Sequence, residues 1–280
     1  MLPFVASPTV SIGGHEFSVF GPLVVLGLGV GIGVAVARAK ANRLDRGLEL
    51  DLIWHAVVIG FVISHVFDVV AYHPGRVLED PAELLRFWGT MSSFGGMLGG
   101  LLGMAIFFAR TREKLDRHQR LAYVDTIAFG FPFAWVFGRL ACTLVFDHPG
   151  GLTEFPLATS LITEEARVFA TGVYERAGQL DALPLHDDLI HYGLHNLGFY
   201  EFLYTVFVIV PVFVTLANRP RPPGFFLAAF FLVYAPIRFL LDFARMNDAR
   251  YFGLTPAQYA AVFVFVAAFA MVARLETRAA

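Results

Sequence analysis

The sequence predicts an all-α integral membrane protein with about seven transmembrane helices and a small extracytoplasmic head. First, 57% of the 280 residues are hydrophobic and only 16% are charged, with a mean hydropathy of +0.63, which is far from the composition of a soluble domain. Second, the hydrophobic residues recur in stretches of about twenty, the length at which a helix crosses a hydrocarbon core of roughly 30 Å. Third, one segment, 147–196, is long and polar, and it predicts the head.

The transmembrane helices are predicted from apolar runs that end at charged or polar residues. These runs give spans near 17–37, 51–72, 88–109, 122–146, 197–217, 224–243 and 257–273. The glycines of 26–36 lie inside the first span, where small residues let helices pack closely, so we interpret them as packing residues and not as a nucleotide-binding loop. The prediction is one polytopic membrane domain over 1–280, with the head inserted at 147–196.

Basic residues give the predicted orientation. The short links 38–50, 110–121 and 218–223 are rich in Lys and Arg, and short basic links face the cytoplasm. With an odd number of spans, the N-terminus is predicted to be extracytoplasmic and the C-terminus cytoplasmic. The first residues lack the basic start and the cleavage site of a signal peptide, so the first span is expected to direct membrane insertion.

Charge and cysteine content exclude several classes of protein. The formal net charge of −2 argues against a nucleic-acid partner. The single cysteine, Cys142, excludes a disulfide framework within one chain and a zinc site built on several thiolates. We therefore predict no cofactor and no metal. A transport path is also disfavoured, because its polar residues would be spread through the full depth of the membrane.

Ionisable and polar side chains gather near the predicted outer ends of the spans. Placing an ionisable group inside a bilayer costs several kcal/mol, so each one needs a partner, a wet cavity or a task. Because they cluster at one depth, we predict a polar site at the level of the outer lipid headgroups. Its members are His65, Asp68, Ser92, Ser93, Arg139, His195, Tyr200, Glu201, Tyr234, Arg238, Asp242 and Arg245.

Several of these residues also have a purely structural interpretation. Arg238 and Asp242 are spaced i,i+4, and His65 and Asp68 are spaced i,i+3, so each pair can neutralise itself on one helix face. Arg139 has no carboxylate three or four residues away in its own span, so it is predicted to meet another helix or a ligand. A guanidinium binds phosphate through paired hydrogen bonds, which favours a phospholipid. We assign interfacial belts or core packing to Tyr72, Trp88, Trp135 and Tyr192.

Four segments resemble the prolipoprotein diacylglyceryl transferase family of bacteria. WVFGRLACTLVFDHPG at 135–150 is similar to its signature loop, in which an Asn follows three residues after a Gly-Arg pair and an acidic residue follows later. YAPIRFLLDFARMND at 234–248 is the more specific match, because its Tyr, Arg, Asp and Arg occupy all four positions of a family motif. HNLGFYE at 195–201 and MSSFGGMLGG at 91–100 are similar to two further motifs.

The resemblance implies an activity, its substrates and a location. The family transfers a diacylglyceryl group from phosphatidylglycerol to the lipobox cysteine thiol of a secreted prolipoprotein and releases glycerol phosphate. The implied partners are phosphatidylglycerol and a signal-peptide-bearing prolipoprotein, and the implied location is the bacterial cytoplasmic (inner) membrane. Two alternatives are a paralogue that uses another acceptor or lipid, and a non-catalytic phospholipid-binding membrane protein.

The motifs and the depth of the polar residues together give candidate site residues. The catalytic candidates are His65, Arg139, Arg238 and His195. The substrate-binding candidates are Ser92, Ser93, Gly95, Gly96, Gly138, Cys142, Asp147, Tyr200, Glu201, Tyr234, Asp242 and Arg245.

The sequence departs from the family pattern in ways that keep the arginines but remove one candidate base for the thiol proton. Phe94 stands where the family has a His, Cys142 where it has an Asn, and Phe20 where it has an aromatic hydroxyl.

A replacement for the missing imidazole is therefore expected elsewhere. His65 is predicted at the depth of Phe94, because it lies seven residues inside Tyr72 and Phe94 lies six inside Trp88. We predict that His65 acts as the base and that Asp68 orients it. The rivals for this role are His195 and His148.

Overall fold

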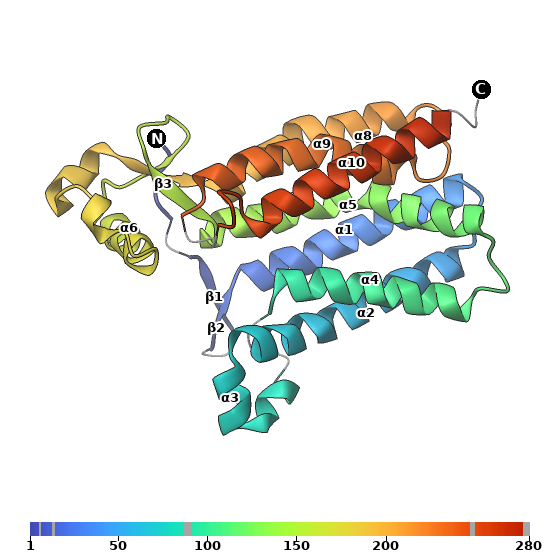
Figure 1. The fold of residues 1–280 in the computed structure, drawn as a ribbon, viewed down its shortest axis with the longest axis horizontal. Coiled ribbons are helices and arrows are strands. Elements are labelled where there is room, and N and C mark those ends of the chain that lie inside the picture. Colours follow the sequence, from blue (N-terminus) through green and yellow to red (C-terminus); the bar gives the residue numbers. More distant parts are fainter. Residues whose placement is uncertain (6, 13–14, 87–90, 247–249, 277–280) are drawn as a thin grey trace. The chain divides into compact units, whose positions relative to one another are not determined.

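The predicted membrane class is confirmed. The computed structural model describes residues 1–280 except 6, 13–14, 87–90, 247–249 and 277–280. Six of the described helical stretches are long and apolar enough to cross a membrane: Phe20–Ala41, Arg46–Ala71, Arg117–Val145, Leu197–Ala217, Phe225–Ala244 and Pro256–Leu275. A further apolar helix, Gly95–Arg110, is shorter. The chain is a mostly helical, multi-pass membrane protein (Figure 1).

Each predicted span has a helical counterpart, with ends that differ from the predicted ones by up to five residues. Helix α4 runs Ser93–Arg110, whereas the predicted span was 88–109. The helix begins at this point because Oγ of Ser92 accepts a hydrogen bond from the Gly95 N–H at 3.2 Å and caps it. The residues upstream form two short helices, α3 (Pro74–Glu79) and η2 (Pro81–Leu85). Trp88, which was assigned to a belt or to packing, lies outside the described residues.

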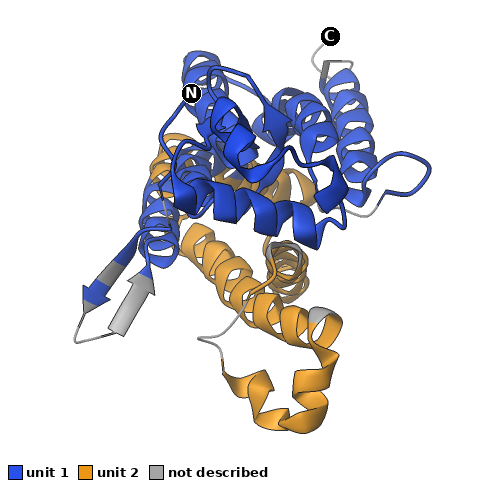
Figure 2. Ribbon diagram, turned by 90° about the vertical axis from the view of Figure 1, so that its left-hand side faces the viewer, with its two compact units in different colours: residues 1–33, 128–280 blue, residues 34–127 orange. Residues whose placement is uncertain are grey.

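The chain forms two compact units, which have different colours in Figure 2. Unit 1 comprises Met1–Gly33 and Ala128–Ala280, and unit 2 comprises Val34–Ile127. Helices α1 (Phe20–Ala41) and α5 (Arg117–Val145) each contribute residues to both units.

In unit 1, the segment predicted as the head forms a small α/β structure. Strands β3 (Pro149–Thr153), β4 (Thr159–Ser160) and β5 (Gly193–Asn196) make an antiparallel sheet in the order β3-β5-β4. Helix α6 (Glu164–Arg176) begins after Thr163, whose hydroxyl accepts a hydrogen bond from the Ala166 N–H at 3.3 Å. Two 3-10 turns, η3 (Leu180–Ala182) and η4 (His186–His191), lead to β5. The buried core of this structure consists of Phe146, Leu161, Ala166, Ala170, Val173, Tyr174, Leu189 and Leu194.

The remaining spans of unit 1 follow the head. Helix α7 (Leu197–Tyr204) continues through the π-helical segment η5 (Thr205–Ile209) into α8 (Val210–Ala217). Helix α9 (Phe225–Leu241) ends in the 3-10 turn η6 (Asp242–Ala244) and runs beside α10 (Pro256–Glu276) (Figure 1). At the N-terminus, β1 (Thr9–Ile12) and β2 (His15–Ser18) form an antiparallel hairpin that leads into α1.

Glycines of α1 allow it to lie directly on α5 within unit 1. A Cβ added at Gly27 would lie 2.8 Å from the carbonyl oxygen of Ala134, and one added at Gly31 would lie 2.8 Å from the Ala134 Cβ. A larger residue at either position would therefore push the helices apart. The interpretation as packing residues is confirmed for Gly27 and Gly31, whereas a Cβ at Gly29 or Gly33 would meet nothing within 4 Å.

In unit 2, α2 (Arg46–Phe67) and α4 pack along their length, and α2 continues as the π-helical segment η1 (Asp68–Tyr72). Glycines of α4 make this close approach possible. A Cβ at Gly95 would lie 2.6 Å from the Phe67 Cβ, and a Cβ at Gly99 would lie 2.7 Å from the carbonyl oxygen of Ile59. The buried core of unit 2 includes Leu52, Phe107, Leu115 and Tyr123.

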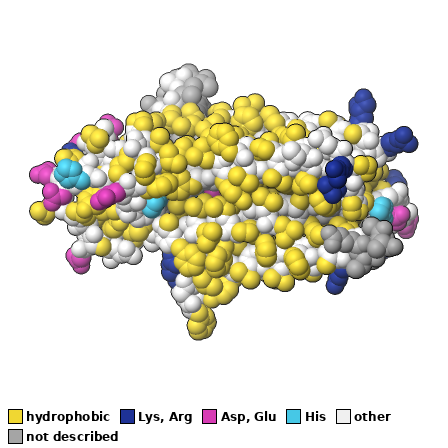
Figure 3. Space-filling view, turned by 90° about the horizontal axis from the view of Figure 1, so that it is seen from above, with side chains coloured by type: hydrophobic (Ala, Val, Ile, Leu, Met, Phe, Trp, Pro, Cys, Tyr) yellow, Lys and Arg dark blue, Asp and Glu magenta, His cyan; other side chains and the backbone are white. Residues whose placement is uncertain are grey.

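Large hydrophobic side chains cover much of the exterior, as expected of helices that face lipid. Examples are Val25 on α1, Trp54 on α2 and Phe263 on α10, which are exposed by 69%, 67% and 74%. Hydrophobic side chains predominate on the face shown in Figure 3.

Candidate functional site

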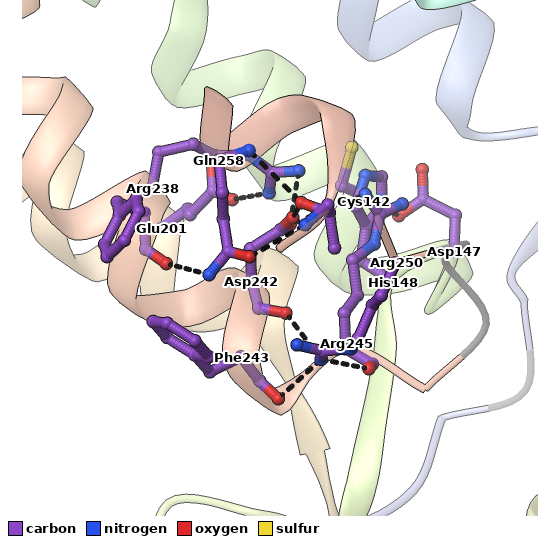
Figure 4. A network of polar contacts seen from close by, with 12 residues as sticks. Cys142, Asp147, His148, Glu201, Arg238, Asp242, Phe243, Arg245, Arg250 and Gln258 are labelled. Carbon is purple, nitrogen blue, oxygen red and sulfur yellow. Dashed lines mark hydrogen bonds and ion pairs between the residues drawn. The ribbon is translucent and has the colours of Figure 1, made fainter. Parts of the chain in front are cut away.

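The polar residues predicted in unit 1 meet where the head joins the spans. Arg139 lies near the C-terminal end of α5, Glu201 in the first turns of α7, Arg238 in the last turn of α9 and Asp242 in η6. The head connects α5 to α7 through β3 and β5, so the path of the chain brings the ends of these two helices together, and a backbone bridge from Gly150 to Arg245 joins β3 to the segment after α9. Figure 4 shows Glu201, Arg238 and Asp242 in one network of polar contacts.

Arg139 finds its partners on two other helices. Its side chain is buried, and its Nε lies 3.0 Å from Oε2 of Glu201. Its Nη2 lies 3.4 Å from the hydroxyl of Tyr234, and its guanidinium lies over the Trp135 ring, 4.2 Å from the ring centroid. The prediction that Arg139 meets another helix or a ligand is confirmed, and the partner is a carboxylate of α7.

Glu201 joins the two arginines that the sequence placed at the same depth. Only 1% of Glu201 is exposed. Its Oε1 accepts a hydrogen bond from Nη1 of Arg238 at 2.9 Å, and its Oε2 accepts one from the Tyr234 hydroxyl at 2.6 Å. This carboxylate is stable when buried because both of its oxygens are paired and hydrogen-bonded.

Asp242 extends the network to a third arginine. Nη2 of Arg238 lies 2.8 Å from Oδ1 of Asp242, so the predicted i,i+4 pair is present. Nη1 of Arg245 lies 3.8 Å from the same oxygen, and the Thr255 hydroxyl donates to Oδ2. The result is a chain of alternating charges in which three guanidinium groups meet two carboxylates.

Two buried atoms of this network of ion pairs lack a hydrogen bond in the described part of the chain. Within the described residues, Nε of Arg139 and Oδ1 of Asp242 are buried without a partner in hydrogen-bond geometry, although both are in ion-pair contact. Because Nε of Arg139 is engaged by Glu201, a bound anion would use the N–H donors of Nη1 and Nη2.

A second group, Cys142, Asp147 and His148, lies beside these ion pairs. The Sγ of Cys142 is 3.8 Å from Nη1 of Arg139, and one ligand atom from each of the three residues lies within 4.8 Å of the other two. Nδ1 of His148 contacts the carboxylate of Asp147. Thiol, carboxylate and imidazole are side chains that accept protons or bind metal ions. These three residues are therefore a second reactive group of the site, next to the ion pairs.

His195 and Tyr200 lie at the junction of the head with α7. Nδ1 of His195 is 2.9 Å from the Tyr200 hydroxyl. His195 is half-buried, and this burial lowers its pKa from the ordinary value of a histidine, because desolvation disfavours the charged imidazolium.

The remaining candidates lie in unit 2. His65 is 1% exposed, and its Nε2 is 2.9 Å from the carbonyl oxygen of Glu83. Because a carbonyl can only accept, Nε2 carries the proton and Nδ1 is the basic nitrogen. Oδ2 of Asp68 lies 3.8 Å from Nε2 of His73. The role of His65 as a base stays a prediction.

The glycine-rich start of α4 has a structural role. Gly95 is buried against α2, and Ser92 both caps α4 and accepts a hydrogen bond at its carbonyl from the Ser64 hydroxyl at 2.8 Å. At Gly96, an added Cβ would meet Ser64 at an ordinary distance of 3.6 Å. The side chains of Ser93, Phe94 and Tyr72 lie outside the described residues.

Gly138 differs from the other glycines of unit 1. A Cβ there would meet only the Trp135 ring, at an ordinary distance of 3.8 Å. Packing therefore does not explain why a glycine precedes Arg139.

Sequence reasoning missed three residues that support the network. Trp135 was assigned to packing, although its position four residues before Arg139 is the spacing at which a ring and a cation on one helix meet. Thr255 contacts Asp242, and Gln258 donates to the Phe239 carbonyl at 3.0 Å. Both come from the start of α10, and no local spacing links them to the other site residues.

Comparison with known proteins agrees with these motifs. A family model described as prolipoprotein diacylglyceryl transferase matches residues 8–274. The chain is 26% identical over 221 residues to a phosphatidylglycerol–prolipoprotein diacylglyceryl transferase of Mannheimia succiniciproducens, which is 76% of this chain and 71% of that protein. It is 30% identical to the protein of the same name from Polynucleobacter asymbioticus, over 72% of this chain and 66% of that protein. It is also 30% identical to that of Xylella fastidiosa, over 71% of this chain and 66% of that protein.

Proposed function

Because the chain belongs to the prolipoprotein diacylglyceryl transferase family, we propose that it transfers a diacylglyceryl group from phosphatidylglycerol to the lipobox cysteine thiol of a prolipoprotein. The sulfur forms a bond to the glyceryl carbon that carries the phosphate. The carbon–oxygen bond to the phosphate breaks, glycerol phosphate leaves, and the thiol proton passes to a base.

The observation that carries this proposal is the chain of ion pairs from Arg139 to Arg245. Three guanidinium groups and two carboxylates leave one positive charge in excess. The phosphodiester of phosphatidylglycerol carries one negative charge, so it compensates this excess. The guanidinium groups of Arg139, Arg238 and Arg245 supply N–H donors to the phosphate, and the same donors stabilise it as it leaves.

The proton acceptor is an imidazole in this proposal, because a thiol with a pKa near 8.5 is mostly protonated at neutral pH. His65, His195 and His148 are the candidates. The contacts favour His148, because it lies with Asp147 beside Cys142, whose sulfur touches Arg139. Asp147 would hold the imidazole and stabilise its charged form.

Comparison of three variants tests this choice. Removal of a general base typically lowers the rate by about 100-fold or more, and we expect this loss for His148→Gln but not for His65→Gln or His195→Gln. A loss confined to His65→Gln would instead support the prediction made from the sequence. Phosphatidylglycerol binding, measured separately, identifies variants that only misfold.

We also propose the orientation and the partners. The basic links 38–50 and 110–121 face the cytoplasm and the head at 147–196 faces outward, as a small insertion in a single membrane domain of the bacterial inner membrane. The partners are then phosphatidylglycerol and a prolipoprotein whose lipobox reaches the outer end of the spans.

The decisive experiment uses the purified full-length chain, phosphatidylglycerol and a lipobox peptide. Mass spectrometry should find the peptide heavier by one diacylglyceryl group, and it should find free glycerol phosphate. Binding of phosphatidylglycerol without transfer would favour the non-catalytic alternative. If a component of a cell extract is modified and the lipobox peptide is not, the chain is a paralogue that uses another acceptor.

A further inference from the structure

The turn that follows α5 is held in an unusual backbone conformation. Phe146, directly after the last residue of α5, has a φ of 50°, which lies in the left-handed region that favours glycine. Its ring is buried in the head core and stacks on Phe169, 5.0 Å between centroids. Packing of this ring therefore stabilises a turn that costs free energy, and the turn directs Asp147 and His148 back toward Cys142.

The other side of the same turn is also fixed. The Leu197 N–H donates to the His148 carbonyl at 3.2 Å, and Gly150 forms a backbone bridge with Arg245. A Cβ at Gly150 would lie 2.8 Å from both the Ala244 carbonyl oxygen and the His195 Cβ, so the chain is pressed against its neighbours there. The short segment that carries Asp147 and His148 is thus anchored at both ends, as preorganised ligands require.

We propose that Cys142, Asp147 and His148 bind one Zn²⁺ ion, with the fourth coordination position open. Their ligand atoms lie within 4.8 Å of one another. A tetrahedral zinc ion needs neighbouring ligand atoms about 3.5 Å apart, which side-chain movements of about 1 Å can provide. Thiolate and imidazole favour zinc over magnesium or calcium. The single cysteine excludes only a zinc site with several thiolates. One thiolate, one imidazole and one carboxylate are also suitable zinc ligands.

The surrounding charges are compatible with this ion. On binding, the Cys142 thiol releases its proton to the solvent, so that Zn²⁺, one thiolate and one carboxylate together carry no net charge. Arg139, whose Nη1 is 3.8 Å from the sulfur, is already paired with Glu201. The ion would occupy His148 and Asp147, so bound zinc should inhibit transfer if His148 is the proton acceptor. The expected inhibition rests on the proposed function, whereas zinc binding does not.

The test uses Co²⁺ as a spectroscopic probe on the purified full-length protein. Because Cys142 is the single cysteine of the chain, a thiolate-to-cobalt charge-transfer band can come only from this residue. We expect the band with one Co²⁺ per chain and its loss when Zn²⁺ is added. Zn²⁺ should also protect Cys142 of the unaltered protein from alkylation, a readout that needs no variant.

Variants show whether all three residues are ligands. Cys142→Ser should abolish the band, and Asp147→Asn and His148→Gln should each weaken metal binding by about tenfold or more. His191→Gln, an exposed histidine of the same head, is the matched control and should change nothing. The proposal is overturned if the folded protein gives no thiolate band, or if Asp147→Asn and His148→Gln leave metal affinity unchanged. Zinc binding without inhibition would leave the metal site standing and remove His148 as the proton acceptor.

Discussion

Glu201 is the residue on which the arrangement of the buried arginines depends. Its two oxygens contact Arg139, Arg238 and the Tyr234 hydroxyl, so one carboxylate organises side chains from α5 and α9. Arg139 differs from Arg238 because its own helix has no carboxylate three or four residues away. A guanidinium has five N–H donors, so Arg139 can contact Glu201 and still offer donors to a second anion, which in the proposed function is the phosphate of the lipid.

Arg139→Lys should lower transfer although it keeps the charge. An ammonium is a point charge and cannot replace the planar fork that contacts Glu201 and Tyr234 while offering a donor to phosphate. Loss of one charge-assisted hydrogen bond corresponds to a decrease of about 10- to 100-fold in kcat/KM. Arg167→Lys, in an ion pair on the head surface, is the matched control and should keep full activity. Equal activity of the two variants would argue against a phosphate-binding role of Arg139.

Glu201→Gln should destabilise the protein. It leaves the buried Arg139 and the partly buried Arg238 without their shared anion, and breaking a buried ion pair in this way costs about 3–5 kcal/mol. Thermal unfolding in detergent should show a lower midpoint than for Glu164→Gln, whose ion pair with Arg167 is on the surface and whose removal should shift the midpoint little. An unchanged midpoint for Glu201→Gln would show that the arginines find other partners.

His195 should make stability depend on pH. Burial lowers its pKa in the folded protein below the value of about 6.5 expected in the unfolded chain. The unfolded chain therefore binds a proton first as the pH falls, and stability decreases from about pH 6.5 downward until the folded pKa is passed. His195→Gln should flatten this part of the pH profile of the unfolding midpoint. A profile identical to that of the unaltered protein would contradict a half-buried His195 whose pKa is lowered by desolvation.

At the scale of elements, two glycines near the site differ in whether helix packing requires them. A Cβ at Gly198 of α7 would lie 3.0 Å from the Cys142 carbonyl carbon and 3.1 Å from the Thr143 nitrogen, so α7 contacts α5 through this glycine. Gly138 of α5 meets no such obstacle.

This contrast gives a matched pair of variants. Gly198→Ala should lower the unfolding midpoint, because backbone of α5 must move. Gly138→Ala should keep or raise it, since alanine favours a helix by roughly 0.5–1 kcal/mol over glycine. If Gly138 makes room for the substrate, Gly138→Ala should nevertheless reduce transfer. Full activity of a stable Gly138→Ala protein would remove Gly138 from the site.

The sequence predicted the elements well where the membrane dictates them. Apolar runs of about twenty residues must form helices in lipid, so the spans were recognisable without tertiary information. The start of α4 was missed because the Ser92 cap gives a weaker signal than the apolar run. The π-helical segments η1 and η5 and the small sheet of the head depend on contacts between distant residues, which no local pattern records.

The candidate site was predictable in part for a similar reason. Charged residues inside spans are rare, so Arg139, Glu201 and Arg238 were visible as a group. Their connectivity was not, because it depends on which helices meet. The i,i+4 rule predicted the contact between Arg238 and Asp242, but the bridge from Glu201 to Arg139 joins residues of different helices. The left-handed Phe146, which directs Asp147 and His148 toward Cys142, had no signal in the sequence.

At the scale of the whole molecule, the proposed reaction requires that the head and the polar site face outward, where secreted prolipoproteins emerge. Thiol labelling of intact cells tests this orientation. Lys114 in a basic link and Asp187 in the head are exposed, so both are suitable positions for a cysteine. In a Cys142→Ser background, a membrane-impermeant maleimide should label Asp187→Cys but not Lys114→Cys, and both should react once the membrane is permeabilised. The asymmetry of basic residues is the physical reason, because short links rich in Lys and Arg stay in the cytoplasm. Labelling of Lys114→Cys alone would invert the orientation, and the transferase would then face away from its prolipoprotein substrate.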